Sequence, residues 1–123
     1  MKIPDNNQTV MPYLILPHAA EFISFAEKVF NAKEISKYMR DEKTIMHAEI
    51  MIGDSTIMFA DATEEFKSST AGLFIYVENS DKTFQKAIGE GASVVNEMSD
   101  QQYGRSGGIK DPFGNNWWIT TPK

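Results

Sequence analysis

Hydrophobic and polar positions along the chain follow two different periods. Between residues 19 and 30, apolar side chains recur three and four positions apart, with polar and charged residues between them. This spacing places the apolar side chains on one face of an α-helix. The apolar positions are Phe22, Ile23, Ala26, Val29 and Phe30. Asn31 comes next, and asparagine readily adopts the left-handed conformation that ends a helix.

A period of two residues runs from Thr44 to Ile52 and predicts a half-buried strand. One face of this strand is expected to carry Met46, Ala48, Ile50 and Ile52, and the other Ile45, His47, Glu49 and Met51. Residues 55–60 are expected to return beside it as the second strand of a hairpin. Two earlier strands are expected at residues 10–16 and 33–39, on either side of the helix.

The same order of elements returns after a polar segment. The later elements are expected as a strand at 73–77, a helix from 79–81 to Gly91, a strand at 92–96, a polar loop at 97–102 and a strand at 103–110. Pro112 ends the last of these strands, because its φ is fixed and it has no N–H to donate. Gly114 and Asn115 tolerate positive φ and predict a tight turn before a final Trp-Trp-Ile strand.

Landmarks of the two halves are separated by a nearly constant offset. Leu14 and Phe74 are 60 positions apart, as are Ala32 and Ala92, and Gly53 and Gly114 are 61 apart. One βαβββ unit cannot bury its sheet face alone, so two copies are expected to pack together. The sequence therefore predicts an α+β fold, with one domain over residues 1–123 built of two tandem βαβββ modules at about 8–61 and 72–121.

Composition excludes several classes of function. The 41% hydrophobic and 24% charged content is that of a soluble globular protein. No apolar run approaches the roughly 20 residues of a membrane span, and no signal peptide is apparent, so a cytoplasmic protein without a membrane partner is expected. The absence of Cys excludes disulfides and thiolate chemistry. A net charge of −5 argues against a nucleic-acid partner.

Three stretches resemble the vicinal oxygen chelate superfamily, which contains glyoxalase I, bleomycin and fosfomycin resistance proteins and extradiol dioxygenases. They are the helix at residues 21–30, His47-Ala48-Glu49-Ile50 through Gly53-Asp54, and Asp111-Pro112-Phe113-Gly114. The chain looks closest to a branch labelled glyoxalase-like or demethylubiquinone-methyltransferase-like. The resemblance implies the glyoxalase/bleomycin-resistance/dioxygenase fold, in which the two modules form a cup-shaped sheet backed by helices. It also implies a homodimer.

Members of the superfamily hold a divalent metal with side chains on the first and last strand of each module, usually His and carboxylates. The matching positions in this chain are Pro12 or Tyr13, Met58 or Phe59, Gly72, and Trp118. None of these side chains suits a hard or borderline cation. No Gly-rich strand-to-helix turn is present to hold an adenosyl cofactor. The sequence therefore predicts neither a metal nor a cofactor.

His47 and Glu49 stand two residues apart on one expected strand, so both project from the same face. They are the candidate catalytic residues, either as a general acid–base pair or as half of a metal site. The alternatives are a solvent-facing polar surface, a hydrogen-bonded pair at a subunit contact, and a polar contact to a ligand in the cup.

The candidate ligand-binding residues are mostly apolar. Trp117 and Trp118 point to opposite sides of an extended strand, so one is expected in the core and the other in the cup. The expected ligand contacts in the cup are Tyr13, Met51, Met58, Phe59 and Trp118. Arg105, in a Gly-rich segment, is a candidate for holding an anionic group at the mouth of the cup. The same apolar side chains can instead simply fill the cup.

These observations favour a protein that binds a small aromatic or apolar molecule without the superfamily's metal. Two alternatives stay open at this point. One is a glyoxalase-like lyase or a dioxygenase that uses His47 and Glu49. The other is a structural or regulatory dimer whose cup is filled by its own side chains.

Overall fold

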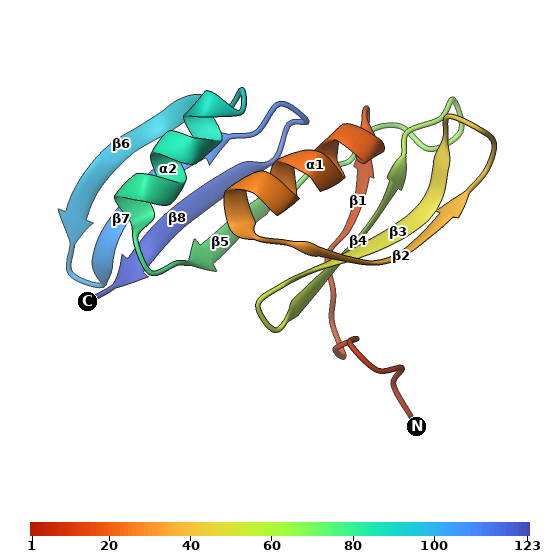
Figure 1. The fold of residues 1–123 in the computed structure, drawn as a ribbon, viewed down its shortest axis with the longest axis horizontal. Helices are drawn as coiled ribbons and strands as arrows, with labels where there is room; N and C mark the ends of the chain where they lie inside the picture. Colours follow the sequence, from red (N-terminus) through yellow and green to blue (C-terminus); the bar gives the residue numbers. More distant parts are fainter. The chain divides into compact units, whose positions relative to one another are not determined.

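The computed structural model describes all residues from Met1 to Lys123 and contains two compact units, Met1–Thr70 and Ala71–Lys123. We call them the first and second unit and describe each by itself. Each unit holds one helix and one four-stranded sheet, as Figure 1 shows. The two βαβββ modules of the α+β fold predicted from the sequence are therefore present.

The first unit follows the order β1 (Tyr13–Leu16), α1 (Ala19–Phe30), β2 (Lys33–Met39), β3 (Ile45–Ile52) and β4 (Ser55–Asp61). Its sheet has the spatial order β1-β4-β3-β2. Strand β1 runs parallel to β4, whereas β2, β3 and β4 pair in antiparallel fashion. The parallel pair is possible because α1 provides the long crossover that parallel strands need.

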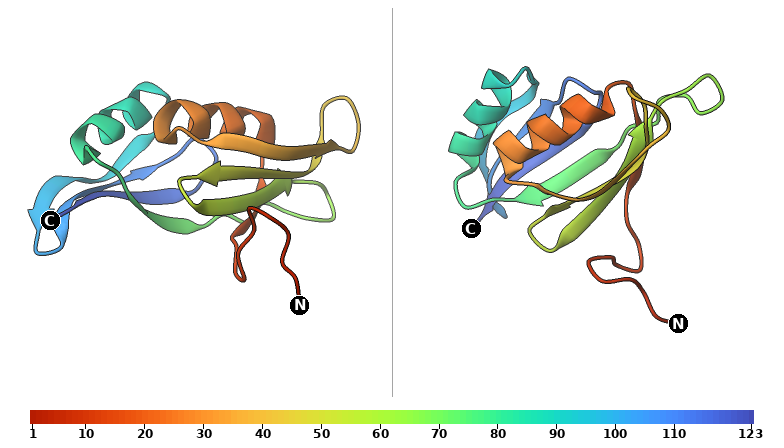
Figure 2. Two further views of the ribbon diagram at one scale, coloured as in Figure 1. Left: turned by 60° about the horizontal axis from the view of Figure 1, so that its bottom comes forward. Right: turned by 45° about the vertical axis from the view of Figure 1, so that its right-hand side comes forward.

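The second unit repeats this order as β5 (Gly72–Tyr76), α2 (Ser80–Gly89), β6 (Ser93–Gln101), β7 (Gly104–Lys110) and β8 (Asn116–Pro122). Its sheet order is β5-β8-β7-β6, with β5 parallel to β8. Each of the two sheets has the same topology. Figure 2 shows α2 lying along one face of its own sheet. In each unit we call the sheet face away from the helix the open face.

Helix α1 forms where the helical spacing predicts it and buries its apolar stripe against β3 and β4. Phe22 is fully buried and meets Phe59 of β4 edge to face, with ring centroids 5.1 Å apart. Asp61, at the end of β4, accepts hydrogen bonds from the backbone N–H groups of Ala19 at 2.8 Å and Ile45 at 2.7 Å. It thereby pairs one of the N–H groups at the helix start that lack an intrahelical acceptor. Asn31 ends the helix with φ of 57°.

Helix α2 packs mainly on β7 and β8 through Phe84 and Ala87. Asn79 precedes the helix and accepts a hydrogen bond from the backbone N–H of Lys82 at 3.1 Å. This is the usual arrangement of a side-chain N-cap. On the sheet beneath, Trp117 is almost completely buried at 2% exposure.

The β7–β8 hairpin is organised by one buried carboxylate. Asp111 accepts hydrogen bonds from the backbone N–H groups of Phe113 and Asn115, the side-chain amide of Asn115, and the indole of Trp117. Gly114 has φ of 104°, as predicted, but Asn115 does not adopt positive φ. Its side chain instead accepts a hydrogen bond from the N–H of Ala71 at 3.1 Å, which ties the turn to the segment before β5.

Two boundaries and the register of one strand pair differ from the expectation. Residues 97–102 were expected as a loop, but β6 continues to Gln101 and pairs with β7. Both faces of this edge strand are largely exposed, so no hydrophobic alternation marks it. Strand β1 begins only at Tyr13, and Val10 is 85% exposed. A register shift opposite Tyr38 and Met39 moves Ile45 to the buried face and leaves Met46 exposed.

Neither α1 nor α2 is long and apolar enough to cross a membrane.

Candidate functional site

The open face of the first unit carries most of the polar candidates. Residues that pair across neighbouring strands project to the same side of a sheet. Met58 of β4 pairs with Tyr13 of β1 and with Glu49 of β3, and His47 pairs with Tyr38 of β2. Met51 follows Glu49 by two positions and projects from the same face.

Phe59 lies on the other side of this sheet. It pairs with Leu14 and Ala48, which are buried, and its ring packs on Phe22 of α1. The expectation that Phe59 lines the cup therefore fails, because the alternation along β4 places Met58 on the open face and its neighbour in the core.

Tyr13, His47 and Glu49 form a hydrogen-bonded series on the open face. The hydroxyl of Tyr13 lies 3.1 Å from His47 Nδ1, and His47 Nε2 lies 3.0 Å from Glu49 Oε2. The other carboxylate oxygen, Oε1, accepts a hydrogen bond from the side-chain amide of Asn7 at 3.0 Å. Tyr13 is 49% exposed, so the outer end of the series is open to small molecules.

The directions of these bonds follow from the chemistry of the groups. Hydrogen bonds hold the pKa of Glu49 below its usual range; the bond from Asn7 is the largest cause, and the bond from His47 is the next. An ionised carboxylate can only accept, so His47 Nε2 carries the proton. In the neutral form of the imidazole, Nδ1 is then the nitrogen without a proton and accepts from the hydroxyl of Tyr13. In that form the hydrogen bonds run in one direction, from the Tyr13 hydroxyl through His47 to the Glu49 carboxylate.

The segment before β1 contributes to this site. Asn7 bonds to Glu49, and Gln8 accepts a hydrogen bond from the backbone N–H of Thr56 at 3.0 Å. The hydroxyl of Thr56 donates to the carbonyl of Asn6. Because these partners lie more than 40 positions apart in the chain, no local sequence pattern announces them.

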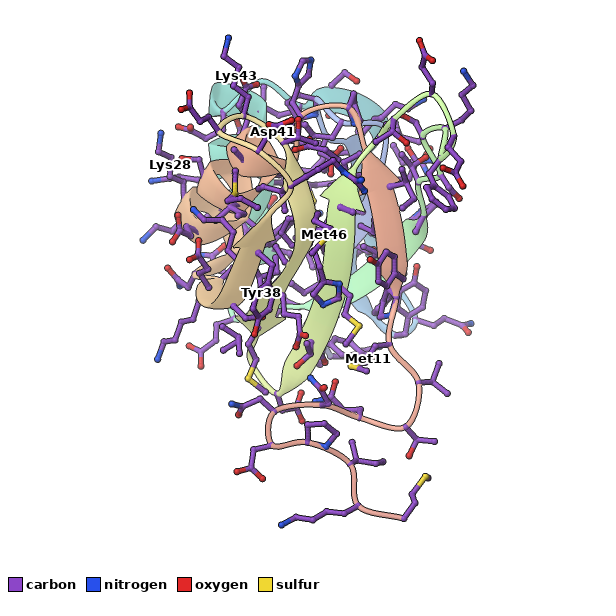
Figure 3. All side chains as sticks on the ribbon, turned by 90° about the vertical axis from the view of Figure 1, so that its right-hand side faces the viewer. Met11, Lys28, Tyr38, Asp41, Lys43 and Met46 are labelled. Atoms are coloured by element: carbon purple, nitrogen blue, oxygen red, sulfur yellow. The ribbon has the colours of Figure 1, made fainter.

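Figure 3 looks at the first unit with Met11, Tyr38 and Met46 labelled. Met11 belongs to the segment before β1, Tyr38 to β2 and Met46 to β3. Tyr38 is exposed, and its ring centroid lies 6.4 Å from that of His47, without a hydrogen bond between the two side chains. Tyr13 and Tyr38 are thus two exposed phenols beside one imidazole, of which Tyr13 is hydrogen-bonded to it.

The open face of the second unit is aromatic. Trp118 is half-buried in β8 and pairs with Phe74 of β5 and Gly108 of β7. A methyl group at Gly72 would lie 3.2 Å from Cζ3 of Trp118, and one at Gly108 would lie 3.5 Å from its Nε1. The indole therefore extends over both neighbouring strands, in space that two glycines leave free.

Three exposed aromatic rings accompany Trp118 on this unit. Phe74 lies 5.1 Å from Tyr76 and 6.2 Å from Tyr103, measured between ring centroids. A pocket of about 350 Å³ adjoins them, and its wall includes Trp118, Tyr103, Asn96, Ser99 and Gln101. The polar residues of this wall come from β6 and the β6–β7 turn. The sequence did not single them out, because an exposed edge strand has no hydrophobic alternation that distinguishes it from a loop.

Of the two adjacent tryptophans, Trp118 is the one on the open face. Trp117 is buried on the helix side, where its indole Nε1 donates to Asp111 at 2.8 Å. The prediction that they face opposite ways is confirmed.

Arg105 projects to the helix side of its sheet, contrary to the expectation that it holds an anionic group at the mouth of the cup. Its guanidinium donates two hydrogen bonds of 3.2 Å to Asp81 of α2 and lies 3.4 Å from Asp100. These bonds, those to Asp81 foremost, raise the pKa of Arg105. With two carboxylates already bound on the helix side of the sheet, this cation is not presented to a ligand on the open face.

The residues present do not fit the superfamily's divalent metal. Tyr13 offers a phenol that is bonded to His47, Met58 a thioether, Gly72 no side chain, and Trp118 only an N–H donor. No group of three or more His, Cys, Asp or Glu side chains in the structure is arranged to hold a metal ion. Oxygen and imidazole ligands in sets of three or more are what Zn²⁺, Mn²⁺ and Fe²⁺ require.

Comparison with known proteins agrees with the fold. The sequence model of the Glyoxalase/Bleomycin resistance protein/Dioxygenase superfamily matches residues 8–119. The uncharacterized protein Mb0911c of Mycobacterium bovis is 32% identical, over 90% of this chain and 81% of its own. TioX from Micromonospora sp. ML1 superposes with a TM-score of 0.77 at 17% identity, covering 95% of this chain and 100% of its own.

TnmS3, an antibiotic binding protein from Streptomyces sp. CB03234, has a TM-score of 0.73 at 14% identity, covering 100% of this chain and 99% of its own. At these identities the two solved structures show a shared fold. The match to the superfamily's sequence model, by contrast, extends over most of the chain. The chain therefore belongs to the Glyoxalase/Bleomycin resistance protein/Dioxygenase superfamily.

Proposed function

We propose that this protein binds a flat, aromatic small molecule on the open face of its second unit, and that it does so without a metal. The observation that carries the proposal is Trp118, whose indole spans two neighbouring strands beside the exposed rings of Phe74 and Tyr103. Such rings bind planar molecules by offset stacking and edge contacts, worth roughly 0.5–1.5 kcal/mol for each pair beyond the burial of area.

The pocket beside Trp118 supports the same reading. Its volume of about 350 Å³ lies within the range of roughly 300–1,000 Å³ that is usual for small-molecule sites. Asn96, Ser99 and Gln101 can hydrogen-bond to polar substituents of the ligand, and Glu97 adds a negative charge to the wall. With Arg105 bound to Asp81 and Asp100, the wall favours a neutral or cationic ligand over an anionic one.

The superfamily relatives are consistent with ligand binding. TnmS3, which shares the fold, is described as an antibiotic binding protein. At 14% identity the comparison carries the fold and not the ligand. For this chain we therefore propose the binding of a small molecule and name no antibiotic.

Two planar dyes of opposite charge test this function, proflavine as the cationic probe and anthraquinone-2-sulfonate as the anionic one. Proflavine is expected to quench tryptophan emission and raise the melting temperature, as mass action requires of any ligand of the folded state. Trp118→Phe should remove most of the quenching. Trp117→Phe is the matched control: it should keep the quenching and cost roughly 1–3 kcal/mol of stability, because that ring fills the core.

The proposal fails if neither dye nor a wider panel of neutral aromatic compounds changes the emission or the melting temperature. A face that is filled by a second copy of the chain would then be the better account. Equal quenching by both dyes would refute the preference for neutral or cationic ligands but not the aromatic site itself.

We also propose that the protein is a homodimer. Strand β6 is nine residues long, largely exposed on both faces, and forms one edge of its sheet. Long unprotected edges invite pairing with another chain. Light scattering at micromolar concentration should therefore give about twice the chain mass of 13.9 kDa, and a mass of one chain would contradict the proposal.

A further inference from the structure

We infer that Tyr13, His47 and Glu49 form a metal-free acid–base site on the first unit, in which the phenol of Tyr13 exchanges a proton with a bound carbonyl compound. These residues belong to the first unit, whereas the aromatic site around Trp118 belongs to the second. Either can fail without the other.

The geometry provides each part that such a site needs. A general base must lie within hydrogen-bond reach of the proton it moves, and His47 Nδ1 lies 3.1 Å from the Tyr13 hydroxyl. The carboxylate of Glu49, 3.0 Å from Nε2, fixes the tautomer and stabilises the positive charge when the imidazole takes a second proton. Asn7 holds the far oxygen of that carboxylate, so the carboxylate itself is kept in one orientation.

Tyr13 is the residue that would touch the substrate. Half of its surface is exposed, whereas the side chains of His47 and Glu49 are exposed by only 25% and 16%. Its neighbour on the adjacent strand is Met58, an apolar and adaptable side chain. His47 and Glu49 act through Tyr13 and are positioning residues.

The class of substrate follows from what the site lacks. No Lys, Arg or metal ligand set bonds to Tyr13, His47 or Glu49, so the site has no fixed cation to neutralise an anion that forms on the substrate. The substrate must therefore spread its own negative charge. A neutral compound with an acidic C–H between two carbonyl groups does so, because both oxygens share the charge of its enolate.

The step balances without an oxidant or a reductant. The substrate C–H bond breaks, and its proton moves to Tyr13 Oη while the Tyr13 proton moves to His47 Nδ1. The products are an enolate and an imidazolium that is paired with the Glu49 carboxylate. Tyr13 then gives its proton to the enolate oxygen and recovers one from His47 Nδ1, which restores the site and leaves the enol tautomer.

An acyl probe measures the activation of Tyr13 without knowledge of the substrate. With p-nitrophenyl acetate, the Tyr13 oxygen attacks the acetyl carbonyl, the phenol proton passes to His47 Nδ1, and p-nitrophenolate leaves. The product is an acetyl ester on Tyr13, which peptide mass spectrometry locates. General-base assistance is worth roughly 10²–10⁴-fold, so Tyr13 should be acetylated about 10²-fold faster than Tyr38 or Tyr76 in the same sample.

Tyr38 and Tyr76 serve as internal controls for the reactivity of an exposed tyrosine. Both are exposed, and Tyr38 also lies beside His47, but neither hydroxyl has a hydrogen bond to an imidazole. Tyr13→Phe should abolish the fast acetylation, and Tyr38→Phe should leave it unchanged. In His47→Ala, Tyr13 should be acetylated no faster than Tyr38. Added free imidazole should restore the fast acetylation, because it replaces the missing base. It could not do so if His47 only maintained the structure.

Glu49→Gln separates charge from shape, because the amide keeps the size of the side chain. It should slow the acetylation of Tyr13 while the circular dichroism spectrum stays that of the wild type. Equal rates for Tyr13 and Tyr38 in the wild type would overturn the inference. So would a His47→Ala variant that acetylates Tyr13 as fast as the wild type, or one that imidazole does not rescue although it is folded.

Discussion

Trp117 and Asp111 are joined across the β7–β8 hairpin by a hydrogen bond of 2.8 Å from the indole Nε1 to Oδ2. Both side chains are buried, and the same carboxylate also receives the backbone N–H groups of Phe113 and Asn115. The Asp-Pro-Phe-Gly-Asn turn is thus held by its first residue. The motif that marks the superfamily in this sequence has a structural role here.

Asp111→Ala should destabilise the protein by at least about 3 kcal/mol, because it leaves several buried donors without an acceptor. Chemical denaturation measures the loss. Asp54→Ala, in the turn of the β3–β4 hairpin, is the matched control: its side chain is exposed and should be worth less than about 0.5 kcal/mol. Equal effects of the two substitutions would show that the hydrogen bonds to Asp111 do not hold the turn.

Asn7→Ala should raise the pKa of Glu49 toward its usual value near 4.5, since the bond from Asn7 is the largest cause of its lowering. A carboxyl whose pKa is lowered in the folded state stabilises the fold above its unfolded pKa. That stabilisation is lost as the pH falls from about 4.5 through the lowered folded value. The stability difference between the wild type and Asn7→Ala should therefore shrink over this interval.

Titration of the Glu49 carboxyl by NMR checks the shift directly. Gln8→Ala is the control, because Gln8 holds the same segment but bonds to Thr56 instead of Glu49. If Gln8→Ala raises the pKa of Glu49 by as much as Asn7→Ala does, the Asn7 amide is not the direct cause.

Gly72→Ala should tilt the indole of Trp118, because the new methyl group would lie 3.2 Å from Cζ3. We expect a shift of tryptophan emission and weaker proflavine quenching. Gly108→Ala adds the same methyl group at 3.5 Å from Nε1, an ordinary contact distance, and should change both readings less. The reverse order would mean that the indole is not held between these glycines.

Zn²⁺ and Mn²⁺ should bind no more tightly than roughly micromolar in calorimetry, because the positions of the superfamily's ligands hold a phenol, a thioether, a glycine and an indole. His47→Ala should leave this weak binding unchanged. Stoichiometric metal that survives dialysis and disappears in His47→Ala would contradict the prediction and place a metal at the His47–Glu49 pair.

The sequence alone determined the elements and their repetition. The helical stripe at residues 19–30 and the constant offset between the halves are local signals, because the period of apolar positions fixes which secondary structure can bury them. The same reasoning showed that Trp117 and Trp118 face opposite ways. It also placed His47 and Glu49 on one side of a strand, since side chains in strands alternate.

Only the tertiary structure decided which side is which. Trp118 is on the open face because Trp117 pairs with Asp111 and packs under the helix side, and Phe59 is in the core because it meets Phe22. Tyr13 and Asn7 join His47 and Glu49 across more than 30 positions of chain. Strand order and register bring these residues together, and a sequence pattern read along the chain does not contain that information, because pairing across strands has no fixed spacing in sequence.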